Sequence, residues 1–202
     1  MVVLSREDAR QVAEISAELD TIRIGARSAI EDVLPAARRL LDVEIMSVYS
    51  LVESSKGWLF ERLVEDGQCG RSSRFWEAVA WAFTRVDTLF YDPRSPAVEM
   101  RNRVVESTAW IDRKVPETWL QSQLCRDVFE PSGMEHHKQL RALVCNDDEM
   151  LGWFGAITPG PVVPRHYRVL SALVPAMQHR LVAERRLGDA CRTRDALERA
   201  LD

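Results

Sequence analysis

The sequence predicts an α+β domain in which antiparallel strand pairs lie between N-terminal and C-terminal helices. Two segments rich in β-branched and aromatic residues, 43–65 and 136–157, each contain a tight turn near their middle. Helical periodicity precedes the first segment and follows the second. Hydrophobic residues make up 46% and charged residues 29% of the 202 residues, so the chain can form an ordinary globular core.

Two helices are predicted before the first strand pair. Ser5 and Asp8 have the spacing of a capping box. Hydrophobic residues then recur at alternating steps of three and four, the period of a coiled-coil seam, and these are Val12, Ile15, Leu19, Ile22 and Ala26. The second helix is expected over about 27–41, and Pro35 is expected to kink or split it.

The first strand pair is predicted at 43–52 and 58–65, around a turn at 54–57. A helix over about 72–86 and a short strand over 88–91 are expected to follow it.

The segment 94–131 is open to more than one interpretation. Residues 98–107 fit either a strand or a short helix. Pro116 suits the first turn of a further helix, whose apolar face would consist of Trp119, Leu120, Leu124 and Val128. The second strand pair then spans 136–145 and 150–157, around a turn at 146–149.

A long helix after the Pro-rich break at 158–164 has two apolar stripes. The first consists of Tyr167, Leu170, Val174, Met177 and Leu181. The second has near-heptad spacing, interrupted by Arg180 and Arg194, and consists of Ala176, Ala183, Leu187, Ala190, Leu197 and Leu201. A helix that is apolar on two sides usually packs against two partners. We therefore expect one stripe to cover the sheet and the other to form a homodimer; the alternative is that both pack within the monomer. The dimer candidates are Val12, Ile15, Leu19, Ala183, Leu187 and Leu197.

Several motifs of the chain resemble those of a known family. They are Trp119 with Ser122, Val128-Phe-Glu-Pro131, Gly133, Gln139-Leu-Arg-Ala-Leu-Val-Cys145, Leu151-Gly-Trp-Phe-Gly155, and the helix 170–187 with Pro175 inside it. These motifs resemble those of GAF domains, in particular those of the GAF-like regions upstream of LuxR-type helix-turn-helix domains in bacterial transcription regulators. The resemblance covers roughly residues 5–187.

The GAF resemblance implies a central antiparallel sheet of five or six strands, with helices from both termini on one face and a ligand pocket on the other. It divides the chain into N-terminal helices that pack with the exit helix (1–41), a sheet and pocket region (42–163), and a C-terminal signalling and dimerisation helix (164–202). The implied function is sensory and non-catalytic. Because a fold does not fix a function, the ligand and any cofactor remain unknown.

LuxR-type regulators end in a DNA-binding domain, whereas this sequence stops at Asp202 within a charged helix. We therefore expect a fragment of a longer regulator, whose signal passes to a downstream output domain or a partner protein. Two alternatives are a stand-alone protein-interaction scaffold with a collapsed pocket, and a GAF-type methionine sulfoxide reductase that would use Cys69 and Cys125.

The ligand-pocket candidates are aromatic and basic residues in the expected pocket region. Trp76, Trp110 and Trp119 would form aromatic walls, as in many small-molecule sites, and Arg101 and Arg103 could hold an anionic ligand by bidentate contacts. Core packing of the tryptophans and a solvated face for the arginines are the alternatives.

Charge and composition argue against several other classes. A net charge of −4 disfavours direct nucleic-acid binding or an anionic membrane surface. There is neither an apolar run of membrane-spanning length nor a signal-peptide pattern, and the four scattered cysteines suit a reducing cytoplasm. His136 and His137 are adjacent on a predicted strand, where they would point to opposite faces, so no metal site is expected.

Overall fold

The computed structural model describes residues 3–21, 28–54, 57–67, 96, 98–109 and 119–201. The helices are α1 (Arg6–Asp20), α2 (Ala29–Leu41) and α5 (Pro164–Leu201). The strands are β1 (Ile45–Ser54), β2 (Gly57–Gly67), β3 (Val105–Glu106), β4 (Lys138–Asn146) and β5 (Glu149–Thr158). The predicted helix at 72–86 and strand at 88–91 lie outside the described residues.

The five strands form one antiparallel sheet in the order β2-β1-β5-β4-β3. The two hairpins β1–β2 and β4–β5 meet in the middle, where β1 pairs with β5. Both predicted strand pairs and the α+β class are therefore confirmed. In the central register, Ser47 of β1 lies opposite Gly155 of β5, which in turn lies opposite Arg141 of β4.

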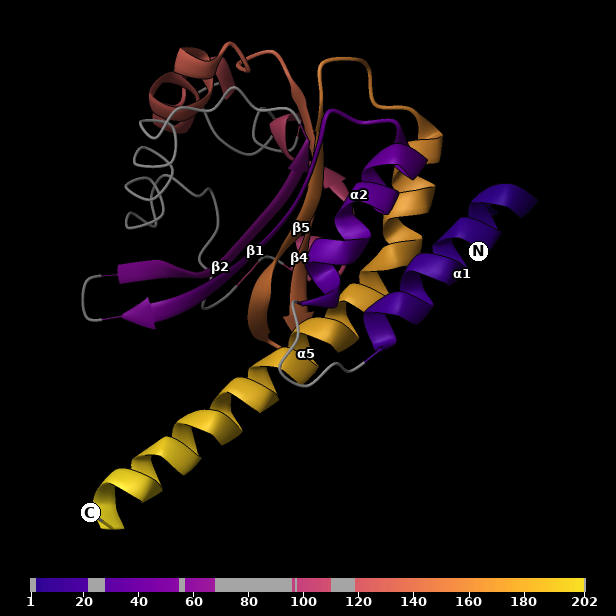
Figure 1. Ribbon diagram of the computed structural model, residues 1–202. Coiled ribbons are helices and arrows are strands. Elements are labelled where there is room, and N and C mark those ends of the chain that lie inside the picture. The colour runs from indigo at the N-terminus through magenta and orange to yellow at the C-terminus, as the bar shows by residue number, and fades with distance from the viewer. Residues whose placement is uncertain are drawn as a thin grey trace.

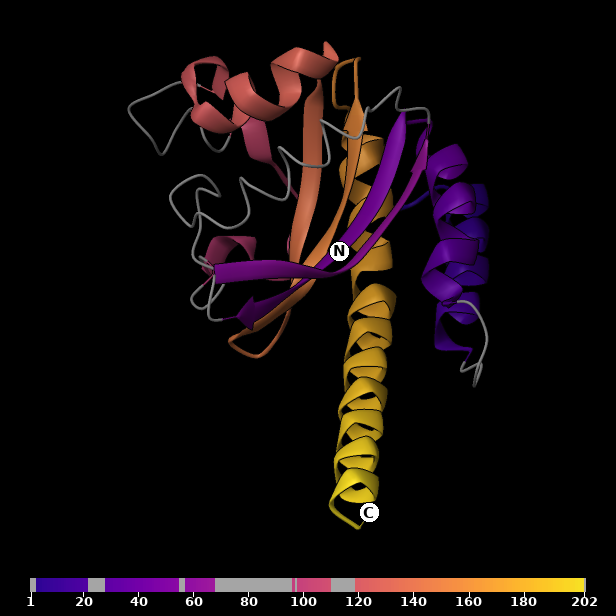
Figure 2. The same ribbon diagram turned by 60° about the vertical axis from the view of Figure 1, so that its left-hand side comes forward.

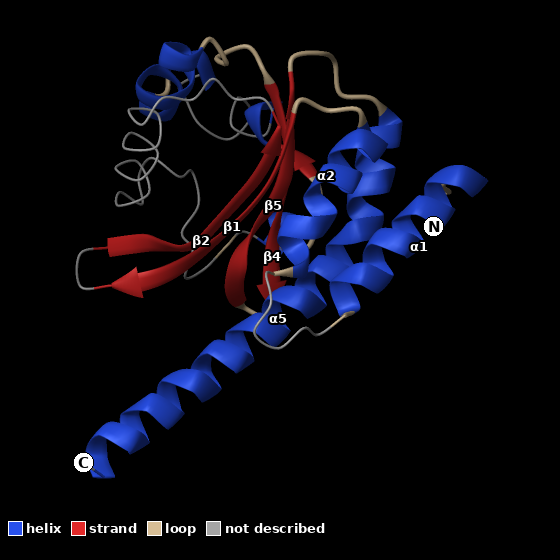
Figure 3. Cartoon of the chain, in the orientation of Figure 1, coloured by secondary structure: helices blue, strands red, loops and turns tan. Residues whose placement is uncertain are grey.

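Helices α1, α2 and α5 all lie on one face of this sheet, as Figures 1 and 3 show. Helix α5 packs on β4 and β5, α2 packs on β1 and β2, and α1 covers α2 and α5. The core between them includes Met46, Val48, Leu140, Ala142, Val144, Phe154, Val169, Leu170 and Leu173, all nearly inaccessible to solvent. This is the arrangement of sheet and helices that the GAF resemblance implied.

Helix α1 begins as predicted, because the Ser5 hydroxyl accepts a hydrogen bond from the Asp8 backbone N–H at 3.0 Å. The Asp8 carboxylate does not complete a capping box; it accepts a hydrogen bond from the Arg165 guanidinium of α5 at 2.6 Å. The helix ends at Asp20, so the predicted seam residues Ile22 and Ala26 lie outside the described part of the chain.

The α1 residues proposed for a dimer seam are instead part of the monomer's own core. Val12, Ile15 and Leu19 are buried against α2 and α5. The helices against which these residues pack belong to the same chain. These three residues are therefore not available to a second copy without unfolding the helical layer.

Helix α2 is capped by the Ser28 hydroxyl, which accepts a hydrogen bond from the Ile30 N–H at 3.2 Å, and it ends at Asp42 in the left-handed region. Pro35 lies inside the helix and does not split it, contrary to one of the two predicted outcomes.

The predicted helix after Pro116 is replaced, from Trp119 onward, by a series of tighter and wider turns. A 3₁₀ helix (Trp119–Gln121), a π-helix (Cys125–Phe129) and a second 3₁₀ helix (Glu130–Ser132) follow one another. Ser122 interrupts regular α-helix because its hydroxyl donates to the Trp119 carbonyl and accepts from the Cys125 N–H. Leu120, predicted on the buried face, is 48% exposed. Residues 98–107 also contain both alternatives, a 3₁₀ helix (Val98–Met100) and then β3.

Helix α5 is 38 residues long, about 57 Å at 1.5 Å per residue, and its C-terminal part extends beyond the sheet and the other helices (Figure 2). Among the described helices, none is long and apolar enough to cross a membrane. The first predicted stripe packs on the sheet and its neighbours, with Leu170, Val174, Met177 and Leu181 buried.

Arg180, which interrupts the second stripe of α5, connects the three helices. Its guanidinium donates to Glu184 at 2.7 Å and to the carbonyl of Thr21, just beyond α1, at 2.9 Å. The Ser28 hydroxyl at the start of α2 donates to the same Glu184 carboxylate at 2.6 Å. Because the Arg180 guanidinium is buried and the Glu184 carboxylate is largely shielded from solvent, each charge is stabilised by the other.

Replacing Arg180 by alanine is expected to reduce the free energy of unfolding by about 3 kcal/mol, since the Glu184 carboxylate would remain buried without its main partner. Urea denaturation followed by circular dichroism measures this loss. The matched control is Arg186→Ala, at an exposed position of the same helix, which is expected to change stability by less than about 0.5 kcal/mol. Equal effects of the two substitutions would contradict this account of the helical layer.

Candidate functional site on the second face of the sheet

The sheet face opposite the helices, called here the second face, has a polar and aromatic centre. Side chains alternate between the two faces of a strand. Since Met46, Val48, Leu140, Ala142 and Phe154 face the helices, their neighbours point the other way. The residues so placed on the second face include Ser47, Tyr49, Gln139, Arg141 and Trp153.

Arg141 lies on β4, an interior strand of the sheet, and is only 6% exposed. Its guanidinium carbon is 5.0 Å from the centre of the Trp153 ring, a cation–π distance. The space that it occupies depends on Gly155, the residue opposite it on β5. A Cβ atom at Gly155 would lie 2.6 Å from the Leu140 carbonyl oxygen and 3.1 Å from the Arg141 Cβ, so a larger residue there would displace the arginine or the strand.

Trp153 continues the contact towards β1. Its ring lies 5.3 Å from the ring of Tyr49, with the two planes inclined by 54°. The Tyr49 hydroxyl donates a hydrogen bond to the Glu65 carboxylate of β2. Glu65, Tyr49, Trp153 and Arg141 thus form a connected row across four neighbouring strands, called here the cross-strand row.

A small cavity of about 40 Å³ lies beside this row, lined by Ser47, Tyr49, Gln139, Arg141 and Trp153 with nearby backbone. The side-chain Nε2 of Gln139 is buried and has no hydrogen-bond partner among the described residues. A buried amide N–H without a partner costs about 1–3 kcal/mol, so it marks a place where a ligand atom or a water would be stabilised.

The predicted pocket residues are only partly brought together here. Trp119 is buried, packs edge-on against Phe129 at 5.0 Å and donates from Nε1 to the Glu135 carbonyl at 2.8 Å, so its contacts are those of a core residue. Trp76 and Trp110 lie outside the described residues.

The two predicted arginines lie at the edge of β4 rather than on the cross-strand row. The Arg101 guanidinium donates to the Pro96 carbonyl at 2.8 Å and forms an ion pair with Asp148 in the β4–β5 turn. Arg103 is exposed. An anion at Arg101 would have to displace the Asp148 carboxylate.

Arg141 was not among the residues predicted from the sequence, although a signal for it was present. An arginine in the middle of an apolar strand pattern is unusual, because arginine is rarely buried. Alternation from Gln139 would have placed it on the face opposite Leu140 and Ala142. Arg141 is buried because β4 is an interior strand of the sheet. The strand order, on which this depends, was not evident from the sequence.

No metal site is found within the described ranges. His136 and His137 precede β4 instead of lying on it, which corrects the strand-based prediction. His136 is exposed, whereas the ring of His137 lies 3.2 Å from the Glu44 carboxylate at the start of β1.

Two of the described cysteines, Cys125 and Cys145, have the properties of structural thiols. Cys125 and Cys145 are buried, and burial raises the pKa of each thiol to about 11. At neutral pH only about one thiol in ten thousand would be ionised at such a pKa, whereas nucleophilic cysteines have lowered values. Cys69, which the reductase alternative pairs with Cys125, lies outside the described residues.

Comparison with known proteins gives only distant likenesses. No family model and no curated protein matches the chain. Among solved structures it is similar to the free methionine-R-sulfoxide reductase of Neisseria meningitidis in complex with its substrate, with 12% identity, a TM-score of 0.48, and coverage of 93% of this chain and 97% of that chain.

It is also similar to the NLH2 GAF domain of A. aeolicus in an inactive state, with 13% identity, a TM-score of 0.45, and coverage of 88% and 97% of the two chains. A third likeness is to the bacteriophytochrome RpBphP3 of R. palustris, with 17% identity and a TM-score of 0.46, in which 98% of this chain matches 42% of that one. At these identities and TM-scores the likenesses carry no argument about activity, so function must be inferred from this chain's own residues.

At pH 8, iodoacetamide is expected to label the exposed Cys191 rapidly, and Cys125 and Cys145 far more slowly. The raised pKa values mean that the thiolate fraction of the two buried cysteines, and hence their labelling, should increase as the pH approaches 11. Peptide mass spectrometry measures each rate, and labelling in guanidinium provides the fully exposed reference. If Cys125 reacts as fast as Cys191 in the folded protein, the reductase alternative gains support.

Proposed function

We propose that this chain is a non-catalytic, GAF-like sensory domain of a bacterial regulator, which binds a small anionic molecule on the second face of its sheet and signals through its terminal helices. The buried guanidinium of Arg141, beside the rings of Trp153 and Tyr49, is the observation on which the proposal rests.

The chemistry of the cross-strand row suits a planar anionic group. A guanidinium has five N–H donors and binds carboxylates and phosphates in bidentate fashion, so it can accept a further partner beside its existing contacts. The Trp153 and Tyr49 rings offer apolar surface next to that charge, and the Gln139 amide offers a further N–H. A ligand with one anionic group and an apolar or aromatic body would satisfy all three.

Strand β4 provides a direct route from the second face to α5. The side chain of Arg141 points to the second face, whereas those of its neighbours Leu140 and Ala142 point to the other face and pack in the core with α5. At the end of the strand, the Cys145 carbonyl accepts hydrogen bonds from the Gln178 side chain of α5 at 2.6 Å and from the Asn102 side chain at 3.0 Å. The Arg185 guanidinium of α5 also forms an ion pair with Glu149 of β5.

A ligand that binds one position of β4 more tightly than another would shift the position of α5 through these contacts. In the second stripe Ala176 is buried, whereas Ala183 is half-buried and Leu187 is 50% exposed. The Leu197 side chain lies outside what the structure describes. We propose that this part of α5 passes the signal to a downstream output domain or a partner protein. The assignment to a LuxR-type transcription regulator rests on the sequence resemblance.

The small cavity favours one alternative, a protein-interaction scaffold with a collapsed pocket. A space of about 40 Å³ admits one or two water molecules, whereas small-molecule sites usually enclose several hundred. The sensory proposal therefore requires the second face to open when its ligand binds.

Native mass spectrometry of the protein purified from its own host tests the proposal. Wild-type protein is expected to carry a small anionic adduct, and Arg141→Met is expected to lose it, because methionine retains an apolar stem but no charge. Arg103→Met, which removes an exposed arginine nearby, is the matched control and should retain the adduct.

Circular dichroism must show that the Arg141→Met variant is folded. An adduct retained by this variant would contradict the site. A wild-type protein without an adduct, whose melting temperature does not rise with any of a panel of aromatic and aliphatic carboxylates and phosphates, would contradict the sensory proposal and favour the scaffold.

A further inference from the structure

The start of α5 lies against the end of α2, and His166 is buried at this junction. Its ring nitrogen Nδ1 accepts a hydrogen bond from the Val163 backbone N–H at 3.3 Å. In the other direction, the His166 backbone N–H donates to the Val163 carbonyl at 3.0 Å. Val163 precedes the helix and has no side-chain oxygen with which to cap it, so the imidazole takes part of the role that glutamate has in a capping box.

The same ring also faces the end of α2. This helix ends at Leu41, whose carbonyl has no partner within the helix and acts as a hydrogen-bond acceptor towards His166. A neutral imidazole suits both neighbours, because one ring nitrogen accepts while the other carries a proton. His166 thus links a helix start, which offers N–H groups, to a helix end, which offers carbonyl groups.

Two charged side chains act on this ring, among the residues that the structure describes. Arg165 of α5 is held by the Asp8 carboxylate of α1 at 2.6 Å, and Asp42 follows the last residue of α2. Burial lowers the pKa of His166 and the Arg165 cation lowers it further, whereas Asp42 and the Leu41 carbonyl oppose this. The net pKa is below the ordinary value of 6.5, so the ring is neutral at pH 7.

We infer that His166 is a pH-sensitive latch between the end of α2 and the start of α5, closed by the neutral ring and opened when the ring takes up a proton from solvent. Protonation places an N–H on Nδ1, which then faces the Val163 N–H and cannot accept from it. It also places a cation at the N-terminal end of α5, where the helix dipole is unfavourable. Both costs are relieved when the ring moves into water, so acid favours the open latch.

The opening of the latch has a defined pH window. In the open form His166 is exposed and its pKa returns to about 6.5, whereas in the closed form its pKa is lower. As the pH falls below about 6.5, the open form binds a proton more readily than the closed form. The open population therefore increases by up to about tenfold per pH unit, until the lowered pKa of the closed form is reached. Above pH 7 the latch does not respond.

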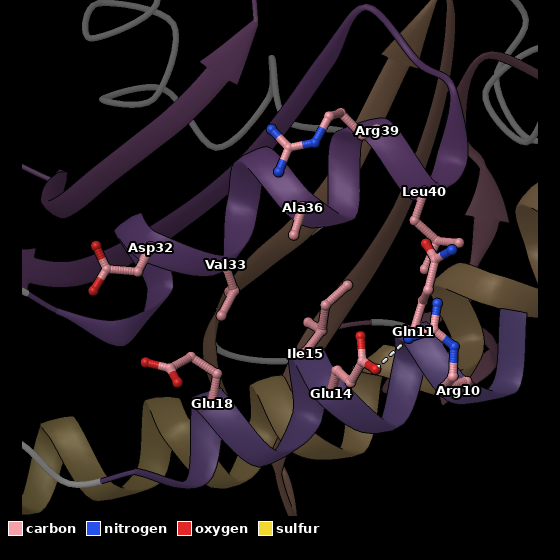
Figure 4. Close-up of a pocket in the computed structure, with 10 residues that line it drawn as sticks. All are labelled: Arg10, Gln11, Glu14, Ile15, Glu18, Asp32, Val33, Ala36, Arg39 and Leu40. Atoms are coloured by element: carbon pink, nitrogen blue, oxygen red, sulfur yellow. Dashed lines mark hydrogen bonds and ion pairs between the residues drawn. The ribbon is translucent and has the colours of Figure 1, made fainter. Parts of the chain in front are cut away.

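The end of α2 has space beside it on the outer side of the helical layer. A groove of about 380 Å³ separates α2 from α1 there, and Figure 4 shows the ten residues that line it. Its apolar floor is formed by Ile15 of α1 and by Val33, Ala36 and Leu40 of α2. Leu40 immediately precedes Leu41, so a small displacement of this end of α2 towards α1 meets open space. The latch is independent of the ligand proposed for the second face.

Hydrogen exchange of the first turns of α5, measured from pH 5 to 7.5 and corrected for the intrinsic pH dependence of exchange, tests the inference. Wild-type protection at 165–170 is expected to decrease by up to about tenfold per pH unit below pH 6.5 and to be constant above pH 7. His166→Gln is expected to keep the protection seen at pH 7 and to lose the pH dependence. A glutamine side chain can accept from Val163 and donate to Leu41, but it does not titrate.

His179→Gln, at an exposed position of the same helix, is the matched control and should retain the wild-type pH dependence. The Asp8 carboxylate does not titrate in this window, because the hydrogen bond from Arg165 lowers its pKa from the usual 3.8. Wild-type protection that is independent of pH would overturn the inference, as would a His166→Gln variant whose protection still decreases in acid.

A second measurement needs no variant. The nuclear magnetic resonance titration of the His166 ring in the wild-type protein is expected to have its midpoint below pH 6.5, together with a shift of the Val163 amide signal at the same midpoint. A midpoint at or above pH 6.5, or a Val163 amide that does not respond, would overturn the inference even if His166→Gln failed to fold.

Discussion

The alternation of side chains along β4 is the constraint on which the rest of the structure depends. Leu140, Ala142 and Val144 fill the core beneath α5, and this arrangement forces Arg141 onto the second face. Shifting the register by one residue would bring a guanidinium into the apolar core, where an unpaired charge is very costly. The packing of α5 and the position of the candidate site are therefore fixed by the same strand. Gly155 contributes by leaving room for the arginine on the neighbouring strand.

Partly buried polar contacts hold the three helices of the layer together. Asp8 with Arg165, and Arg180 with Glu184 and Ser28, join α1 and α2 to α5 at separate points. Such contacts specify how helices meet more than they stabilise them, because the cost of removing charges from water offsets much of their attraction. A helix held in this way can adopt a second position only if its contacts with β4 and the β4–β5 turn change together.

The sequence was sufficient to predict the two hairpins, the N-terminal cap at Ser5 and the long exit helix, because each is specified by local periodicity or a capping residue. It was not sufficient to show which helix packs against which. The apolar seam of α1 has the same period whether its partner is α5 of the same chain or a second molecule, so the period alone could not show that Val12 is buried in the core of the monomer. The turns after Trp119 were missed because a single hydroxyl, that of Ser122, redirects the backbone. Arg141 became visible as a site only when strand order placed it beside Trp153.

Hydrogen exchange of α5, measured on protein that retains its ligand and on protein from which the ligand has been removed, tests the central claim most directly. The claim is that occupancy of the second face is transmitted through β4 to the exit helix. The account predicts that ligand removal increases exchange both in β4 and in α5 around Gln178 and Arg185, where the helix contacts Cys145 and Glu149. Changes confined to the strands, with α5 unaltered, would contradict the account.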